Sequence, residues 1–232
     1  MIKRLQFRCS FKMLTDETGF NSAIEKCKEK AEKLIEEGKL CNVSFYGYKE
    51  MGFLYIEEIT ETENAPLDVE QLMSDLNPYL RSWPEEDGDR YFASMINVYY
   101  HHIPDEDIDK WEHERTTATK TRVGRIAFVF PEKLPSYVKH HTAIVEEGLL
   151  KGDKYAYISM HENLLFSYYE EPRNNVNIKN TDEESKVIND WMAVDPESHF
   201  DREKAKGSNF LVITCLFTAD RVDNMEVPYA HT

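Results

Sequence analysis

The sequence has no long hydrophobic run. None of its apolar stretches approaches the ~18 residues that cross a membrane, and the first ten residues alternate like a strand where a signal peptide would have an apolar core. We therefore expect a cytoplasmic protein with no membrane partner. The 232 residues, 41% of them hydrophobic, suffice for one large domain or two of ordinary size.

Paired cysteines are also missing. The chain has four cysteines, which lie far apart and form no Cys-x-x-Cys motif: Cys9, Cys27, Cys41 and Cys215. This spacing argues against a zinc knuckle and a dense disulfide framework, so we expect reduced and mostly buried thiols. The histidine pairs at 101–102 and 140–141 cannot chelate one ion, because neighbouring side chains diverge on a helix and on a strand. We predict no metal and no cofactor.

Basic residues are in short supply as well. The chain has 28 Lys and Arg against 43 Asp and Glu, which gives a formal net charge of -15 at pH 7. Such a field repels phosphate backbones and anionic lipid surfaces. We therefore expect no nucleic-acid partner, and an uncharged or cationic ligand is easier to admit than a polyanion.

What the first half does contain is a regular alternation of strand and helix patterns. Period-two alternation and aromatic-rich runs predict strands at 3–13, 41–48, 53–60 and 91–101, and apolar residues at helical spacing predict helices from about 20 to 35 and from 68 to 83. The order βαββαβ is typical of a ferredoxin-like unit.

The same order returns after residues 104–122, which we interpret as a polar linker that can be partly helical. The second set comprises strands at 123–130, 154–160, 164–170 and 208–218 and helices at 133–148 and 182–193. We therefore predict an α+β fold of two tandem ferredoxin-like units, 1–103 and 123–232, packed as a fused pseudo-dimeric α+β barrel. A homodimer of fused barrels is a further assembly that this architecture allows.

The helix at 133–148 carries the candidate site. Its apolar face is predicted to consist of Leu134, Tyr137, Val138, His141, Ile144 and Val145. A phenol and an imidazole one turn apart form a compact acid/base pair. Taken from residue types alone, a core histidine with a rim tyrosine is the more ordinary explanation. However, aligning the first helix of each half places Cys27 opposite His141, so the 1–103 half has no counterpart and is expected to serve as scaffold.

The second half resembles the L-rhamnose mutarotase family, small ferredoxin-like proteins that interconvert sugar anomers. The resemblance covers about residues 123–217 and is carried by Gly124-Arg-Ile-Ala-Phe-Val129, Tyr137-x-x-x-His141-x-x-Ile144, Lys154-Tyr-Ala-Tyr-Ile158, Asn163-Leu-Leu-Phe166, Trp191-Met192 and Asp195-Pro196. It implies an isomerase of carbohydrate metabolism, with L-rhamnose or a related 6-deoxy sugar as its small-molecule partner.

Position by position, the resemblance makes His141 the catalytic proton donor and Tyr137 a sugar-binding residue. Tyr155 and Trp191 fall on sugar-contact positions, as does Met192 in place of the second residue of a tryptophan pair. The chain also has Val145 where the family has a tryptophan followed by proline. Opening and reclosing a hemiacetal requires one proton to leave the anomeric hydroxyl and one to reach the ring oxygen, which a His/Tyr pair can supply without a metal.

Two other functions remain open from the sequence. An α+β-barrel monooxygenase, either haem-handling or cofactor-independent, also uses a histidine between helix and sheet. A non-catalytic barrel that binds a small ligand would explain the missing aromatic residues. Fold analogy does not choose among these functions, because one architecture hosts many activities.

Overall fold

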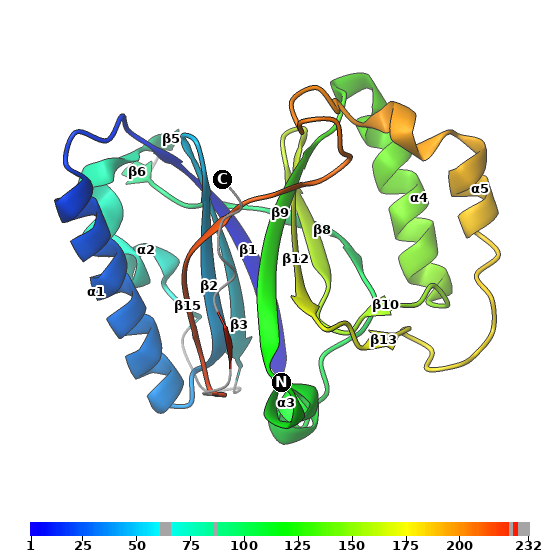
Figure 1. Cartoon of the computed structure of the whole chain (residues 1–232), viewed down its shortest axis with the longest axis horizontal. Coiled ribbons are helices and arrows are strands. Elements are labelled where there is room, and N and C mark those ends of the chain that lie inside the picture. The colour runs from blue at the N-terminus through cyan, green and yellow to red at the C-terminus, as the bar shows by residue number, and fades with distance from the viewer. Residues whose placement is uncertain (61–65, 86–87, 223–224, 227–232) are drawn as a thin grey trace. The chain divides into compact units, whose positions relative to one another are not determined.

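The chain forms two compact units in the computed structural model, which describes residues 1–60, 66–85, 88–222 and 225–226. Unit 1 comprises Met1–Met95, Pro104–Thr119 and Thr214–Thr232, and unit 2 comprises Ile96–Ile103 and Lys120–Ile213. Each unit pairs an antiparallel sheet with helices, so the α+β class is confirmed (Figure 1). No helix among the described residues is long and apolar enough to cross a membrane.

The sheet of unit 1 runs in the order β15-β2-β3-β1-β4, and β7 also pairs with β1. Its strands are β1 (Ile2–Phe11), β2 (Leu40–Tyr48), β3 (Met51–Ile59), β4 (Leu80–Arg81), β7 (Ala93–Ser94) and β15 (Thr214–Asp220). A separate hairpin joins β5 (Trp83–Glu85) to β6 (Gly88–Arg90), and β16 is Met225–Glu226. The helices are α1 (Glu17–Glu36), α2 (Val69–Leu72), α3 (Ile108–Thr117) and the 3₁₀ helix η1 (Ser74–Tyr79).

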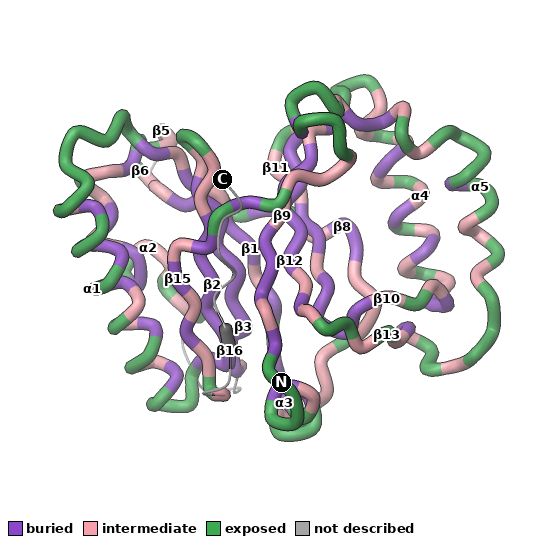
Figure 2. The backbone as a smooth tube through the Cα atoms, in the orientation of Figure 1, coloured by how far each residue is buried: buried purple, intermediate pink, exposed green. Residues whose placement is uncertain are grey.

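Helix α1 follows directly from its sequence. The Asp16 side chain accepts a hydrogen bond from the Gly19 amide at 2.9 Å and caps the first turn. Gly38, with φ of +72°, takes the left-handed conformation that ends the helix. The predicted apolar stripe faces the sheet and packs on β2 and β15, as the buried side of α1 in Figure 2 shows.

Glycine at position 52 is required by the packing beneath α1. A Cβ atom there would lie 2.5 Å from Cys9 Sγ and 2.8 Å from Phe11 Cζ, closer than real contacts allow. All four cysteines are free and buried, as expected from their spacing.

The sheet of unit 2 runs in the order β14-β9-β12-β11-β8. Its strands are β8 (Ile96–Tyr100), β9 (Lys120–Phe128), β11 (Tyr157–His161), β12 (Leu164–Glu171) and β14 (Leu211–Val212), and β10 (Gly152–Asp153) pairs separately with β13 (Asn175–Val176). The helices are α4 (Leu134–Glu147), α5 (Ile188–Ala193) and the 3₁₀ helices η2 (Pro131–Lys133) and η3 (Pro196–His199). Helices α4 and α5 share one hydrophobic core with this sheet.

Two strands join sheets other than those we expected. Strand β8, predicted as part of the fourth strand of the 1–103 half, pairs with β11 in unit 2. Strand β15, predicted as part of the last strand of the 123–232 half, pairs with β2 in unit 1. The compact units therefore hold different strands from the expected halves, and self-contained tandem ferredoxin-like units are not confirmed.

Three helical predictions also need adjustment. The helix expected at 68–83 is one turn of α2 followed by η1, with Pro78 inside η1. The helix expected at 182–193 begins only at Ile188. The segment 104–122, which we interpreted as a polar linker, contains α3. Two residues of this helix, Trp111 and Arg115, are fully buried in unit 1.

Candidate functional site

His141 lies on the buried face of α4 in unit 2, with Tyr137 one turn earlier, as the stripe predicted. Its Nδ1 atom lies 2.8 Å from the Tyr137 carbonyl oxygen. Because a carbonyl oxygen only accepts hydrogen bonds, Nδ1 must donate. The neutral imidazole is thus held with its proton on Nδ1 and a lone pair on Nε2, for which the described residues provide no hydrogen-bond partner.

Aromatic rings surround this imidazole. The Tyr137 ring stacks on it with centroids 3.8 Å apart, and the rings of Trp191 and Tyr99 meet it edgewise at 4.8 Å and 5.3 Å. His141 keeps 9% of its surface exposed, and Tyr137 keeps 1%. The site is an aromatic cluster packed around the His141 imidazole.

Burial controls the ionisation of the cluster. It lowers the pKa of His141 to about 4 from an ordinary value of 6.5, against the raising effect of the hydrogen bond to Tyr137. Burial also raises the pKa of the Tyr137 and Tyr99 phenols. At neutral pH His141 is uncharged and its one N–H is engaged with a carbonyl, so it is arranged to accept a proton rather than to donate one.

The other predicted site residues are only partly brought together. Trp191, on α5, is buried against His141 and Tyr137. Tyr155 is fully buried, and the Lys154 Nζ atom lies 5.6 Å from the centroid of its ring. Met192 is 62% exposed, so its side chain is not part of the buried cluster. The roles assigned to these residues stay predictions.

Several members of the cluster were missed by the sequence analysis. Ser136 Oγ lies 2.9 Å from His199 Nε2, and His199 Nδ1 lies 3.2 Å from the Asp195 carbonyl oxygen. The His199 ring packs on Trp191, with centroids 4.8 Å apart. Tyr99 comes from β8, which the sequence analysis placed in the other half. Only the motif at Asp195-Pro196 marked this part of the chain, because η3 is too short to show a periodic pattern.

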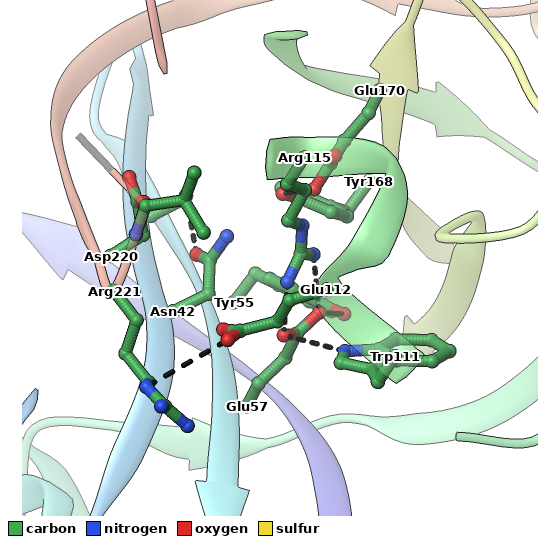
Figure 3. A network of polar contacts seen from close by, with 12 residues as sticks. Asn42, Tyr55, Glu57, Trp111, Glu112, Arg115, Tyr168, Glu170, Asp220 and Arg221 are labelled. Atoms are coloured by element: carbon green, nitrogen blue, oxygen red, sulfur yellow. Dashed lines mark hydrogen bonds and ion pairs between the residues drawn. The ribbon is translucent and has the colours of Figure 1, made fainter. Parts of the chain in front are cut away.

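A second polar cluster lies on the face of the unit 1 sheet opposite α1. Glu57 of β3 accepts hydrogen bonds from Arg115 Nη1 and Nη2 at 2.7 and 2.8 Å, from Trp111 Nε1 at 3.0 Å and from the Tyr55 hydroxyl at 2.7 Å (Figure 3). Burial alone would raise the pKa of Glu57, but the Arg115 ion pair and these hydrogen bonds lower it to about 2.

This cluster has a counterpart in unit 2. In β12 the Tyr168 hydroxyl donates to Glu170 at 2.6 Å, as Tyr55 does to Glu57 in β3. An arginine stands opposite each glutamate in the neighbouring strand, Arg4 opposite Glu57 and Arg122 opposite Glu170. The same Arg and Tyr-x-Glu set therefore occurs on one pair of neighbouring strands in each unit.

Among the residues whose placement is described, no group of three or more His, Cys, Asp and Glu side chains is arranged to hold a metal ion. The cluster at His141 instead combines a neutral imidazole with phenols and an indole, which suits proton transfer to or from an aromatic or apolar ligand.

No family model and no curated protein matches the chain. Similar solved structures include two described as "putative monooxygenase". The protein from Fusobacterium nucleatum subsp. nucleatum ATCC 25586 has a TM-score of 0.41 and 13% identity over 95% of this chain and 94% of that one. The protein from Lactobacillus acidophilus NCFM has a TM-score of 0.41 and 7% identity over 94% and 96%. An anthrone oxidase-like protein has a TM-score of 0.33 and 10% identity over 97% and 98%.

These findings correct our functional prediction. The similar structures are described as monooxygenases and an oxidase-like protein, and none of these three is described as an isomerase, so the predicted L-rhamnose mutarotase activity and its place in carbohydrate metabolism are contradicted. The cluster agrees with this correction, because a neutral His141 with its N–H bonded to a carbonyl is poorly suited to be the proton donor.

Proposed function

We propose that unit 2 carries the active site of a cofactor-independent monooxygenase acting on an aromatic substrate with an ionisable C–H or O–H group. The observation that carries this proposal is the Nε2 lone pair of His141, fixed by the Nδ1 hydrogen bond and set among aromatic rings. The rings offer apolar surface to a flat substrate, and Nε2 is the only member of the pair His141–Tyr137 that can accept its proton at neutral pH.

In the proposed reaction, Nε2 takes a proton from the substrate, and the developing substrate anion raises the proton affinity of the imidazole beside it. The electron-rich anion reduces molecular oxygen, and the two combine as a carbon-bound hydroperoxide. Loss of water then leaves a carbonyl, so that a CH₂ group and O₂ become C=O and H₂O. The proton held by His141 completes the hydroperoxide, the second C–H proton leaves with the distal OH group as water when the O–O bond breaks, and the substrate supplies all the electrons.

The haem-handling variant is less compatible with this cluster. A haem iron would have to approach Nε2, and a macrocycle around it needs a broad slot beside the imidazole. Tyr137 covers one face of the ring, and Trp191 and Tyr99 make T-shaped contacts with it at centroid distances of 4.8 and 5.3 Å. These residues do not fit haem in this arrangement.

Oxygen uptake tests the proposal. Purified protein is mixed with anthrone or a hydroquinone in an oxygen electrode, and we expect consumption of one O₂ per carbonyl formed from anthrone. General-base catalysis of this kind contributes about 10²–10⁴-fold, so His141→Gln should lower the rate by that factor. His113→Gln, on the exposed surface of α3, is the matched control. Equal rates of oxygen uptake in the two variants would contradict the proposal. So would uptake that appears only after haem is added and a Soret band forms. Binding of these compounds without turnover would favour a non-catalytic barrel that binds a small ligand.

The finer architecture belongs to the same proposal. A fused α+β barrel built from two ferredoxin-like halves is supported by the repeated Arg and Tyr-x-Glu set. A homodimer of such barrels, a location in the cytoplasm and the lack of a nucleic-acid or membrane partner stay predictions from the sequence.

A further inference from the structure

Unit 1 contains a cleft that the proposed activity does not use. It has a volume of about 850 Å³, lies between α1, α2 and the adjoining ends of β1, β2 and β3, and falls within the size range of small-molecule sites. Five apolar side chains contribute to its lining, namely Leu34, Leu40, Ile59, Leu67 and Leu72. Leu40 and Leu72 are fully or almost fully buried, so this part of the wall is fixed by the core of unit 1.

The charge of the cleft is opposite to that of the chain. Four lysines line it against three carboxylates, whereas the whole chain carries a net charge of -15. Lys26, Lys30 and Lys33 follow one another at i, i+4 and i+7 on α1, and two smaller hollows continue the cleft along this row. The basic residues thus form a stripe beside an apolar wall.

Two of the four lysines in the cleft are already neutralised. Lys30 Nζ lies 2.5 Å from Asp75 and 2.7 Å from Ser74 Oγ, and Lys39 Nζ lies 2.7 Å from Glu37. Lys3 and Lys33 form no ion pair with any residue that the structure describes. Of the three carboxylates, Glu58 accepts a hydrogen bond from the Leu67 amide and Asp68 caps α2, so both are committed to the wall itself.

We propose that this cleft binds an amphipathic monocarboxylate, with the carboxylate held by Lys33 and Lys3 and the apolar body lying along the leucine and isoleucine wall. Charge complementarity selects an anion locally, although the net charge of the chain slows its approach. A single carboxylate suits two ammonium groups that form no ion pair with the described residues, and a polyanion would meet Glu37, Glu58 and Asp68 as well.

Calorimetric titration of the full chain with dodecanoate, below its micelle concentration, tests this site. We expect one molecule bound per chain, weaker binding at higher salt, and weaker binding of dodecanol, which has the same chain length and no charge. A hydrogen bond to a charged group is worth enough that Lys33→Gln should weaken binding about tenfold, and Lys3→Gln with Lys33→Gln should weaken it further. Lys139→Gln, an equal charge change at an exposed position of α4, should leave it unchanged.

The outcome is decisive in either direction. No binding, equal binding of dodecanoate and dodecanol, or equal affinities of Lys33→Gln and Lys139→Gln would overturn the proposed site. His141→Gln should bind dodecanoate as the wild type does, because the two sites belong to different units. The experiments therefore distinguish a failure of the proposed oxygenase activity from a failure of the proposed carboxylate site.

Discussion

At the scale of single residues, His141 couples the candidate site to the stability of the fold. Its pKa is about 4 in the folded chain and near 6.5 when unperturbed, so between these values the unfolded chain binds more protons. The stabilising contribution of neutral His141 is complete above pH 6.5 and is lost as the pH falls towards 4. The shift corresponds to about 3 kcal/mol at most.

We therefore expect His141→Gln to flatten the pH dependence of the free energy of unfolding between pH 6.5 and 4. Urea denaturation at a series of pH values measures it. Asp153 works in the opposite direction, because burial raises its pKa to about 6 and its effect on stability lies between about 3.8 and 6. Both proteins contain Asp153, so subtracting the stability curve of His141→Gln from that of the wild type removes the contribution of Asp153. We expect a level difference curve for the exposed His113→Gln. A level curve for His141→Gln as well would show that folding does not lower the pKa of His141.

At the scale of elements, α3 is attached to the unit 1 sheet by a buried ion pair. Arg115 and Glu57 are both fully buried, and Trp111 of the same helix donates to the same carboxylate. Removing one partner of such a pair leaves an uncompensated buried charge. The polar appearance of 104–122 in the sequence hides this attachment, since a lone Trp and Arg give no apolar stripe.

Arg115→Met should lower the free energy of unfolding by about 3–5 kcal/mol, and adding Glu57→Gln should recover part of this loss because the stranded charge is removed. Thermal or urea unfolding of the single and double variants measures the coupling. Lys110→Met, at an exposed position of α3, is the control and should cost far less. A double variant no more stable than Arg115→Met would contradict this account of the pair.

At the scale of the whole molecule, the segments 1–103 and 123–232 each contribute one edge strand to the unit formed mainly by the other segment. Strand β8 completes the sheet of unit 2 although it lies in the 1–103 segment, and β15 completes the sheet of unit 1 although it lies in the 123–232 segment. A segment expressed alone lacks one edge strand of its sheet and has one strand without its partner.

We expect fragments 1–103 and 123–232 to be poorly folded when separate and to recover structure when mixed. Amide dispersion in heteronuclear NMR spectra, with circular dichroism, measures this. The intact chain cut at a protease site placed in 104–107 is the control and should keep its fold, because α3 and both exchanged strands are still present. Well-dispersed spectra of either fragment alone would show that its sheet does not need the exchanged strand.

The sequence by itself determined what depends on short-range patterns. Period-two alternation predicted most of the strands, and the 3.6-residue period predicted α1 and α4. The same period predicted that Tyr137 and His141 lie on the buried face of α4. These features follow from backbone geometry within a few residues, so one chain is enough to predict them. The family resemblance was less dependable, because it transferred an activity from motifs that fix a fold.

Only the tertiary structure decided which sheet each edge strand joins and what surrounds each polar side chain. An alternating strand such as β15 can pair with either sheet, and its local pattern does not specify the partner. The low pKa of His141 and the Glu57–Arg115 pair arise from burial and from contacts between residues far apart in the chain. Desolvation and long-range pairing are properties of the assembled fold, and for that reason the chemistry of both clusters emerged only with it.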